Sequence, residues 1–499
     1  MRKNYFLLLS LCFLSVWWTS CSDDDNSLID KPTPEEPAPS GQTTTDEIYY
    51  ANYFAADVLS EVYVWNKEIW NDIDKLDPET NEDPISTVRE IRYKKDGKEM
   101  DKWTMLTNDV ESLTSSLEGV ETTFGYRLAL GKFSNTGNYF FVVSYVYPDS
   151  PAAQAGIKRG DIIMQLDGQD INDDNYLNAL YNSTISLGIG ELQAEGISLK
   201  EDPIALTAVK MYEDPVIVEP KVFDCGGKKV GYLAYTGFDL ASAQKLVDIC
   251  RNFKEEGITE LILDLRYNGG GYVFTECVLA SMLAPESAVS AGEVYQTEQW
   301  NDEYMAYYQE KNIDLNTYFS TEHKLDSYNL EVNTQDSNIG LNKIYALISS
   351  GTASASEGLL IGLMPYMDVQ LIGTNSHGKY CTGIVFEAED LYKNPPKELD
   401  NWGIYVMVSF YADKNGENPC MPDGLVPDVE VEDAVMDGYQ LGDENEAMLH
   451  AALELAGKTD FAPAARSISA LVYKTRSLHV GSSFGKRIDS RLKDKIELK

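Results

Sequence analysis

Apolar residues recur at helical spacing between residues 46 and 118. Phe54, Val58, Leu59 and Val62 follow this spacing, and DVESLTSSLEG repeats it at 109–119. A repeat near 3.6 residues places such side chains on one face of a helix. The pattern predicts a small helical domain over residues 46–118.

Short β-like runs replace the helical pattern over residues 119–213. YFFVVSYVY and DIIMQLDG are examples, separated by Gly, Asp and Pro turn signals. From 214 to 460, predicted strands alternate with predicted helices, as in an α/β layer. The strands are KKVGYLAYTGF, ELILDL, KIYALISS and VQLIG. We therefore expect a multidomain α/β (α+β) protein with a helical domain, a β domain and an α/β core.

Two segments outside these domains have distinctive composition. Residues 22–45 contain PTPEEPAPSGQTTT, which lacks the apolar residues of a core and predicts a flexible linker. Residues 461–499 form a basic C-terminal tail with nine Lys or Arg and three acids. The tail is either a solvated face or a sorting signal, and the sequence leaves both open.

The net charge of −39 argues against a nucleic-acid partner, because a polyanion would be repelled. An apolar share of 43% indicates that most of the chain is globular. The charge therefore fits a soluble protein that works among peptides or other proteins.

The first 20 residues have the pattern of an export signal. Arg2 and Lys3 precede an apolar run at 5–18, and Thr19 and Ser20 lead to Cys21. Ser20-Cys21 resembles the lipobox of bacterial lipoproteins, although Trp18 stands where an aliphatic residue is usual. The resemblance implies cleavage before Cys21 and its lipidation, which makes 21–45 a lipid-anchored linker.

The following SDDD tract resembles one that directs some Gram-negative lipoproteins to the outer surface. We therefore expect a location in the cell envelope, anchored to the outer membrane and either periplasmic or surface-exposed. An ordinary secretory signal is the alternative.

Five cysteines remain after the signal and Cys21 are set aside. Cys250 and Cys277 lie in apolar helical patterns and are predicted core thiols. Cys381 and Cys420 are the one candidate disulfide, and Cys225 is left over. No cysteine or histidine spacing indicates a metal site.

The stretch SPAAQAGIKRGDIIMQLDG at 150–168 resembles the helix-turn-strand signature of PDZ domains. Upstream, Phe124, Gly125, Tyr126, Arg127 and Leu128 occupy the place of the PDZ loop that binds a peptide carboxylate. The resemblance implies that backbone N–H groups of this loop bind a peptide C-terminus while the peptide adds a strand. Arg127 stands where a second Gly is frequent, so a PDZ scaffold that only packs or gates is the alternative.

Three loops of the predicted core collect the residues that carry chemistry. Residues 268–271, 351–354 and 374–379 each follow a strand, and they converge if these strands are parallel neighbours. Ser354 begins a helix and fits a nucleophile, which needs a base to take its proton. Lys379 is that base if burial lowers its pKa. The N–H groups of Gly270, Gly271 and Ala355 would form the oxyanion hole.

DLRYNGGG, TASASE and HGK together resemble the C-terminal-processing (tail-specific) serine peptidases. The resemblance implies a ClpP/crotonase-like core, Ser354 as nucleophile, Lys379 as general base and no cofactor. It also implies polypeptide substrates bound through C-terminal segments. Two positions depart from the family: Gly383 replaces a Gln that orients the lysine, and Gly269 replaces a common Pro.

Neighbouring polar residues have simpler interpretations. Ser350 and Ser356 satisfy local backbone groups, His377 lines a wall, and Asp264 with Arg266 forms a structural ion pair. We therefore predict a serine endopeptidase that forms an acyl-enzyme at Ser354. The alternative is a non-catalytic peptide-binding or ligand-binding protein on a peptidase-like fold, which Gly383 favours. Whether the PDZ-like domain gates the site or delivers substrate is left open.

Overall fold

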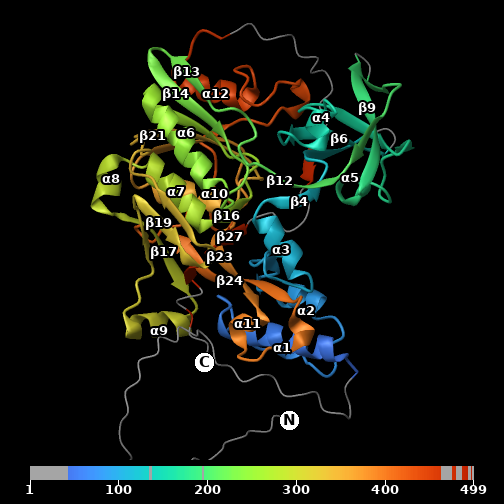
Figure 1. Cartoon of the computed structure of the whole chain (residues 1–499), viewed down its shortest axis with the longest axis vertical. Helices are drawn as coiled ribbons and strands as arrows, with labels where there is room; N and C mark the ends of the chain where they lie inside the picture. Colours follow the sequence, from blue (N-terminus) through green and yellow to red (C-terminus); the bar gives the residue numbers. More distant parts are fainter. Residues whose placement is uncertain are drawn as a thin grey trace, which may run out of the picture.

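The structure is a computed structural model that describes residues 43–133, 137–193, 196–461, 475–478, 486–489, 491–492 and 496. Figure 1 shows the N-terminal helices at one end, the β domain to one side and the α/β core along the length of the molecule. The predicted signal peptide, Cys21 and most of the predicted linker lie outside the described residues. No helix in the described ranges combines the length and apolar character needed to cross a membrane.

The N-terminal helices begin at side-chain caps. The Thr45 side chain accepts from the Ile48 N–H, and Asp83 and Asp109 cap the next two α-helices in the same way. Their apolar faces join the same hydrophobic cluster as the α/β core. The elements are α1 (Asp46–Glu61), η1 (Ile73–Lys75), α2 (Pro84–Ile91), β1 (Lys94–Lys95), β2 (Lys98–Glu99), β3 (Met105–Thr107) and α3 (Val110–Leu117).

The β domain is built around one antiparallel sheet with the order β10-β9-β7-β6-β5-β26. A ribbon of β4 (Val120–Thr123) and β12 (Val209–Tyr212) links it to the rest of the chain. Its strands are β5 (Tyr126–Lys132), β6 (Tyr139–Val146), β7 (Ile162–Leu166), β8 (Gln169–Asp170), β9 (Thr184–Gln193), β10 (Gly196–Leu199), β11 (Ile204–Thr207) and β26 (Thr475–Leu478), with helices α4 (Pro151–Gln154) and α5 (Asn178–Tyr181).

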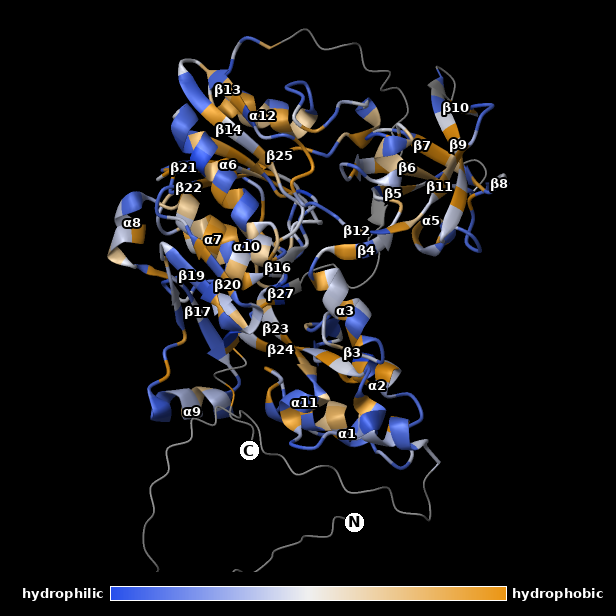
Figure 2. Cartoon of the chain, viewed as in Figure 1, coloured by the Kyte–Doolittle hydropathy of each residue, from blue (hydrophilic) through white to orange (hydrophobic). Residues whose placement is uncertain are grey.

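The central sheet of the core has the order β13-β14-β15-β21-β22-β25, and its last five strands are parallel. Leu261 and Leu263 pack with the cluster that contains α6, α7 and α10, whereas Ile262 packs on the side of α12. Figure 2 shows α7 and α10 in strongly apolar colours, as expected of buried helices. The elements are β13 (Lys221–Cys225), β14 (Lys228–Ala234), α6 (Ala243–Glu256), β15 (Glu260–Asp264), α7 (Val273–Leu283), β21 (Lys343–Ile348), α10 (Ala355–Leu363), β22 (Asp368–Gly373), β25 (Val429–Glu430) and α12 (Ala447–Leu455).

A second core sheet has the order β16-β27-β23-β24-β17-β18, with β3 also paired to β24. Its strands are β16 (Gly270–Tyr272), β17 (Val294–Trp300), β18 (Asn316–Tyr318), β23 (Cys381–Glu387), β24 (Gly403–Ala412) and β27 (Lys486–Ile488). Shorter elements surround both sheets: α8 (Glu286–Ala291), α9 (Asp302–Lys311), β19 (Glu322–Leu325), η2 (Asp326–Tyr328), β20 (Leu330–Asn333), α11 (Ala388–Leu391), η3 (Lys397–Leu399) and η4 (Val435–Asp437).

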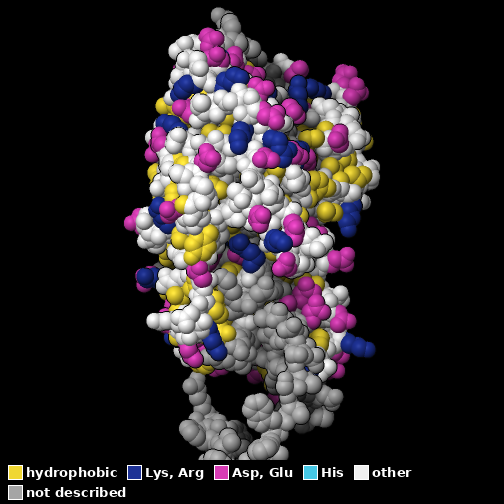
Figure 3. All heavy atoms as spheres, turned by 60° about the vertical axis from the view of Figure 1, so that its left-hand side comes forward, with side chains coloured by type: hydrophobic (Ala, Val, Ile, Leu, Met, Phe, Trp, Pro, Cys, Tyr) yellow, Lys and Arg dark blue, Asp and Glu magenta, His cyan; other side chains and the backbone are white. Residues whose placement is uncertain are grey.

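The described part of the basic segment beyond 461 is not a solvated tail. β26 pairs with β5 of the β domain, and β27 lies between β16 and β23. Arg487 is fully buried, because its charge meets buried carboxylates. Elsewhere acidic and basic side chains are interspersed over the face shown in Figure 3.

A buried ion-pair network joins the β domain to the core. Arg159 of the β domain pairs with Asp433, and Arg266 of the core pairs with Asp433, Asp264 and Glu446. Arg266 has no exposed surface. This confirms the prediction that Asp264 and Arg266 form a structural ion pair.

Candidate functional site

The three predicted loops meet at the carboxyl edge of the central sheet. β15, β21 and β22 are parallel neighbours, so the condition for the three loops to converge is met. They deliver residues 268–271, 351–354 and 374–379 to the same edge. Hydrogen bonds link the first two loops, because the Ala353 N–H donates to the Asn268 carbonyl at 3.0 Å.

Ser354 occupies a strained turn at the start of α10. Its φ of 64° and ψ of −112° lie in a region that non-glycine residues rarely adopt. The residue is fully buried. Within the described ranges, its Oγ has no hydrogen-bond partner. The turn therefore holds a hydroxyl whose proton and lone pairs are uncommitted.

The Glu357 carboxylate ties this turn to the loop that carries Lys379. It accepts from the Ser354 N–H at 2.7 Å, the Lys379 N–H at 2.9 Å and the Gly378 N–H at 2.7 Å. The Ser376 hydroxyl donates to it at 2.5 Å. Burial raises the pKa of Glu357 to about 7, although the donated hydrogen bonds oppose this rise. One side chain thus binds the backbones of both predicted dyad residues.

Sequence reasoning missed Glu357, although a signal was present. Ser354 and Glu357 have the S-x-x-E spacing of a capping box, in which a Glu side chain returns to the N–H of the capping residue. That return bond is the one from Ser354 to Glu357 described above.

Lys379 lies in an aromatic enclosure and is fully buried. Its Nζ donates to the Tyr405 hydroxyl at 2.7 Å and lies 5.0 Å and 5.6 Å from the ring centres of Tyr405 and Trp103. Burial lowers the pKa of Lys379 to about 7, because the charged amine loses its hydration. The amine hydrogen-bonds to Tyr405 and not to the Ser354 hydroxyl.

Gly383 leaves room for Tyr405. A Cβ at Gly383 would lie 2.4 Å from the Tyr405 ring. The space that a side chain at 383 would take is therefore filled by the ring whose hydroxyl binds Lys379. Sequence reasoning named the missing Gln but not Tyr405, because β23 and β24 meet only in the folded sheet.

Tyr411 is a second tyrosine that the sequence did not single out. Its hydroxyl lies 2.7 Å from the Lys379 carbonyl oxygen and 3.3 Å from the Ser354 carbonyl oxygen. It therefore links the two loops through their carbonyl oxygens.

The glycine loop differs from the prediction at Gly270. The Gly270 N–H donates to the Asn268 Oδ1 at 2.9 Å, so it is not free to bind a substrate oxygen. The cause is an Asx-type turn, in which an Asn side chain binds the backbone two residues on. Gly271 has φ 145°, and a Cβ there would lie 2.3 Å from the Phe238 carbonyl oxygen, so only glycine fits. Ala355, the first residue of α10, is fully buried.

Two neighbouring residues have the local roles that the sequence predicted. The Ser356 hydroxyl donates to the Asn268 carbonyl at 3.0 Å. The His377 ring faces Trp103 at 6.2 Å between ring centres, and burial lowers the pKa of His377 to about 4.

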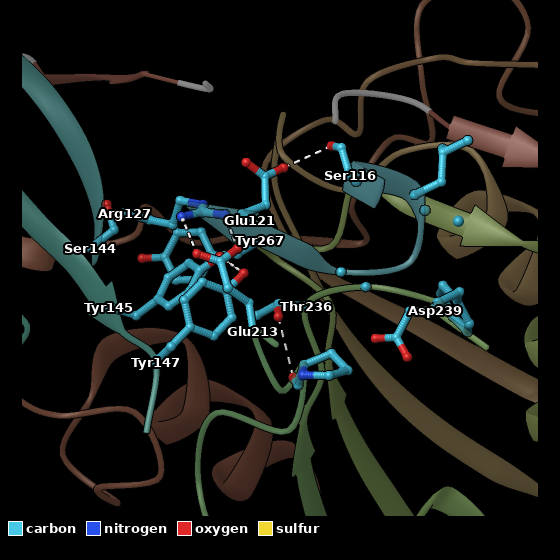
Figure 4. A pocket seen from close by; sticks show the side chains of 18 of the residues that line it. Ser116, Glu121, Arg127, Ser144, Tyr145, Tyr147, Glu213, Thr236, Asp239 and Tyr267 are labelled. Atoms are coloured by element: carbon cyan, nitrogen blue, oxygen red, sulfur yellow. Dashed lines mark hydrogen bonds and ion pairs between the residues drawn. The ribbon is translucent and has the colours of Figure 1, made fainter. Parts of the chain in front are cut away.

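A cavity of about 120 Å³ lies between the β domain and the glycine loop. Residues 269–271, Thr236 and Asp239 line it on the core side, and Tyr145 lines it on the side of the β domain. Figure 4 shows Arg127 and Glu213 paired at this cavity, where the Arg127 Nη2 and a Glu213 carboxylate oxygen lie 2.5 Å apart.

The predicted PDZ loop is mostly turned into the β domain. Phe124 and Tyr126 stack with ring centres 5.6 Å apart, and Leu128 joins the same cluster. Gly125 has φ 82°, and a Cβ there would lie 2.0 Å from the Ser150 Cβ. The β5 edge beyond this loop is paired with β26.

Among the residues that the structure describes, the cysteines form no disulfide and the acidic side chains form no metal site. Cys381 and Cys420 are free buried thiols, as are Cys225, Cys250 and Cys277. In the part of the chain that the structure describes, no group of three His, Cys, Asp or Glu side chains is arranged to hold a metal ion.

Comparisons with known proteins find similarity to peptidases and to PDZ domains. A family model described as Peptidase family S41 matches residues 229–431, and a PDZ domain model matches residues 142–187. The carboxyl-terminal-processing protease of Picosynechococcus sp. is 25% identical over 326 residues, covering 62% of this chain and 64% of that protein. The carboxy-terminal processing protease CtpB of Bacillus subtilis is 25% identical over 278 residues, covering 54% and 48%.

The crystal structure of a putative S41 protease from Bacteroides fragilis superposes with a TM-score of 0.59 at 22% identity. It covers 81% of this chain and 96% of that one, which supports the mixed α/β fold predicted above. The chain spans between 48% and 64% of the length of the two curated relatives. Residues 229–431 of this chain are therefore similar to peptidase family S41, and residues 142–187 are similar to PDZ domains.

Proposed function

We propose that this chain is a serine endopeptidase of the C-terminal-processing type that cleaves polypeptides through an acyl-enzyme at Ser354. The observation that carries the proposal is the Glu357 carboxylate, which binds the backbone N–H groups of both Ser354 and Lys379. The bridge joins the backbones of the two residues that carry an uncommitted hydroxyl and a buried amine, the two groups of a Ser-Lys dyad.

Lys379 acts as general base in this proposal. With a pKa of about 7, a large fraction of the amine is neutral at physiological pH. A neutral amine has two N–H groups and one lone pair. Donation to the Tyr405 hydroxyl uses one N–H and leaves the lone pair to accept the Ser354 proton.

The acyl transfer then proceeds in two stages, acylation of Ser354 and hydrolysis of the acyl-enzyme. The Ser354 oxygen attacks the scissile carbonyl carbon while its proton passes to Lys379. The N–H groups of Gly271 and Ala355 bind the oxyanion, whereas that of Gly270 holds the loop in shape. The Lys379 ammonium returns its proton to the leaving amine as the C–N bond breaks. Water then attacks the acyl carbon while Lys379 takes its proton, and Lys379 passes that proton to the Ser354 oxygen as the ester bond breaks and the product with the new C-terminal carboxyl group leaves.

Substrates of this proposed enzyme are extended polypeptides, bound through their C-terminal segments with the PDZ domain as a second contact. The proposed location is the cell envelope, with a lipid on Cys21 that anchors the mature chain to the outer membrane. The sequence pattern at 1–21 and the acidic tract after it support this part of the proposal.

A polypeptide-binding protein without catalysis is the second candidate. One observation favours it: the Lys379 amine hydrogen-bonds to Tyr405 and not to the Ser354 hydroxyl. The first test below separates the two candidates.

The first prediction concerns the nucleophile. Wild type should react with a fluorophosphonate probe at Ser354, and Ser354→Ala should lose labelling and lose turnover of a denatured protein by about 10⁴-fold or more. Ser356→Ala is the matched control, since that hydroxyl binds the Asn268 carbonyl, and it should still be labelled. Folded wild type that is never labelled would favour the binding protein.

The second prediction is the pH dependence set by Lys379. Because only the neutral amine takes a proton, kcat/KM should fall about tenfold per pH unit below a midpoint near 7 and level off above it. Lys379→Met should abolish turnover. It should be no less stable than wild type at pH 7, because a buried amine with a lowered pKa costs folding free energy below its unfolded pKa. A flat profile between pH 5 and 9 would contradict the assignment.

The third prediction tests Tyr405 as the residue that positions Lys379. Tyr405→Phe should lower kcat about tenfold to hundredfold with little change in KM, because the amine loses its hydrogen-bond partner. The midpoint of the pH profile should also move down, since the hydroxyl stabilises the ammonium. Tyr345→Phe, whose hydroxyl binds Glu260 on another part of the sheet, should change neither quantity.

The fourth prediction concerns the anchor. Mass spectrometry of the mature protein should find an N-terminal Cys21 that carries lipid, and Cys21→Ser should leave the membrane fraction. Cys12→Ser, inside the predicted signal, is the control and should stay with the membrane. A mature chain that starts elsewhere with an unmodified residue would refute the anchor.

A further inference from the structure

Two strands from the C-terminal segment lie on two edges where a polypeptide would bind. β26 pairs antiparallel with β5, and Leu478 lies opposite Leu128 of the predicted PDZ peptide loop. β27 pairs parallel with β16, and Arg487 lies opposite Gly271 of the predicted oxyanion hole. Its other side meets β23, where Ile488 lies opposite Gly383. Strand addition is the usual way in which an extended peptide binds a sheet edge.

The Arg487 side chain fills a buried acidic pocket next to β27. Its guanidinium pairs with Glu276, hydrogen-bonds to Gln296, and donates to the Thr382 hydroxyl at 3.1 Å. It also lies 4.1 Å from the centre of the Tyr411 ring. These contacts come from α7, β17, β23 and β24, so the pocket is assembled by the core and not by the segment itself.

The same pocket borders the proposed dyad. The Tyr405 hydroxyl donates to the Arg487 carbonyl at 3.1 Å and accepts from the Lys379 Nζ at 2.7 Å. A Cβ at Gly358, one turn beyond Ser354 on α10, would lie 2.3 Å from the Arg487 Nη1. The Arg487 backbone therefore approaches the general base, while its side chain lies against the helix of the nucleophile.

The charges of the pocket suit a guanidinium. Glu276 is fully buried, and a Glu298 carboxylate oxygen lies 4.0 Å from the Arg487 Nη2. Buried carboxylates are costly without a cation that also fills their hydrogen-bond sites. A planar guanidinium does this at several acceptors at once, which a lysine ammonium does less well.

We propose that the two described strands of the C-terminal segment, β26 and β27, are an internal ligand of this site, and that the Arg487 pocket is a specificity pocket for an arginine side chain of polypeptide substrates. This inference depends on the proposed peptidase function. β26 occupies the edge of β5 and β27 pairs with β16, and Arg487 takes the place of a substrate arginine. Ser354 and Lys379 each have no exposed surface in this state.

A tethered ligand competes strongly. An intramolecular partner acts at an effective concentration on the order of millimolar, and two contacts on one segment add avidity. A substrate must therefore displace the segment before it reaches Ser354. If the segment were only a structural strand, removing Arg487 would lower both stability and activity. If it is an internal ligand, removing Arg487 weakens the segment and opens the site.

The first test compares full-length wild type with Arg487→Ala by the rate of fluorophosphonate labelling at Ser354. We expect labelling of Arg487→Ala to be at least about tenfold faster, and KM for an added peptide to fall, because a competitor has been weakened. Arg251→Ala, which removes an exposed arginine paired with Asp248 on α6, is the control and should label like wild type. Slower or unchanged labelling of folded Arg487→Ala would overturn the internal ligand.

The second test uses wild type alone, so it stands even if Arg487→Ala does not fold. Products of a denatured-proteome digest should have arginine at one fixed position from the cut. A peptide of that sequence should lose at least about tenfold in kcat/KM when citrulline replaces the arginine, because citrulline keeps the shape but not the charge. An active enzyme with no arginine preference would overturn the specificity pocket and leave the proposed peptidase intact. If neither wild type nor Arg487→Ala is labelled and neither cleaves a substrate, the proposed peptidase itself is overturned, and the inference with it.

Discussion

The buried carboxylate of Glu357 is the constraint on which the site depends. It accepts four hydrogen bonds, one from the Ser354 N–H and three from the Lys379 loop through Ser376, Gly378 and Lys379. A carboxylate in this position is stable only when those donors are in place. The strained φ of Ser354 is therefore held by an interaction that would be lost if the turn relaxed.

The hydrophobic core buries Lys379 as it buries Glu357, and burial shifts the pKa of both side chains. Trp103 comes from the N-terminal region and Tyr405 from β24, and together they exclude water from the amine. Removing water lowers the pKa of Lys379 and makes it a base near neutral pH, but it also costs folding free energy. The apolar helices α7 and α10 and the parallel sheet beneath them offset that cost by burying large hydrophobic surfaces.

Much of this arrangement could be predicted from sequence because it is local or follows sheet topology. Parallel strands followed by short loops placed residues 268–271, Ser354 and Lys379 on one edge, and burial gave the direction of the lysine pKa. Tyr405 and Tyr411 could not be found, because strand pairing that spans tens of residues brings them to Lys379. The predicted oxyanion role of the Gly270 N–H differs from the structure, because this N–H donates to the Asn268 side chain. β27 is three residues long and basic, so no hydrophobic period marks it as a strand.

The Tyr405 hydroxyl connects the Lys379 amine to the strand bound beside it. A hydroxyl has one proton, and here that proton goes to the Arg487 carbonyl, so the hydroxyl accepts from Lys379. The Arg487 carbonyl therefore sets the direction of the bond between Tyr405 and Lys379, and the lone pair of a neutral Lys379 amine is not engaged by the Tyr405 proton. β27 is paired on both sides, with β16 and β23, so a strand of the core sheet reaches the amine through a single hydroxyl.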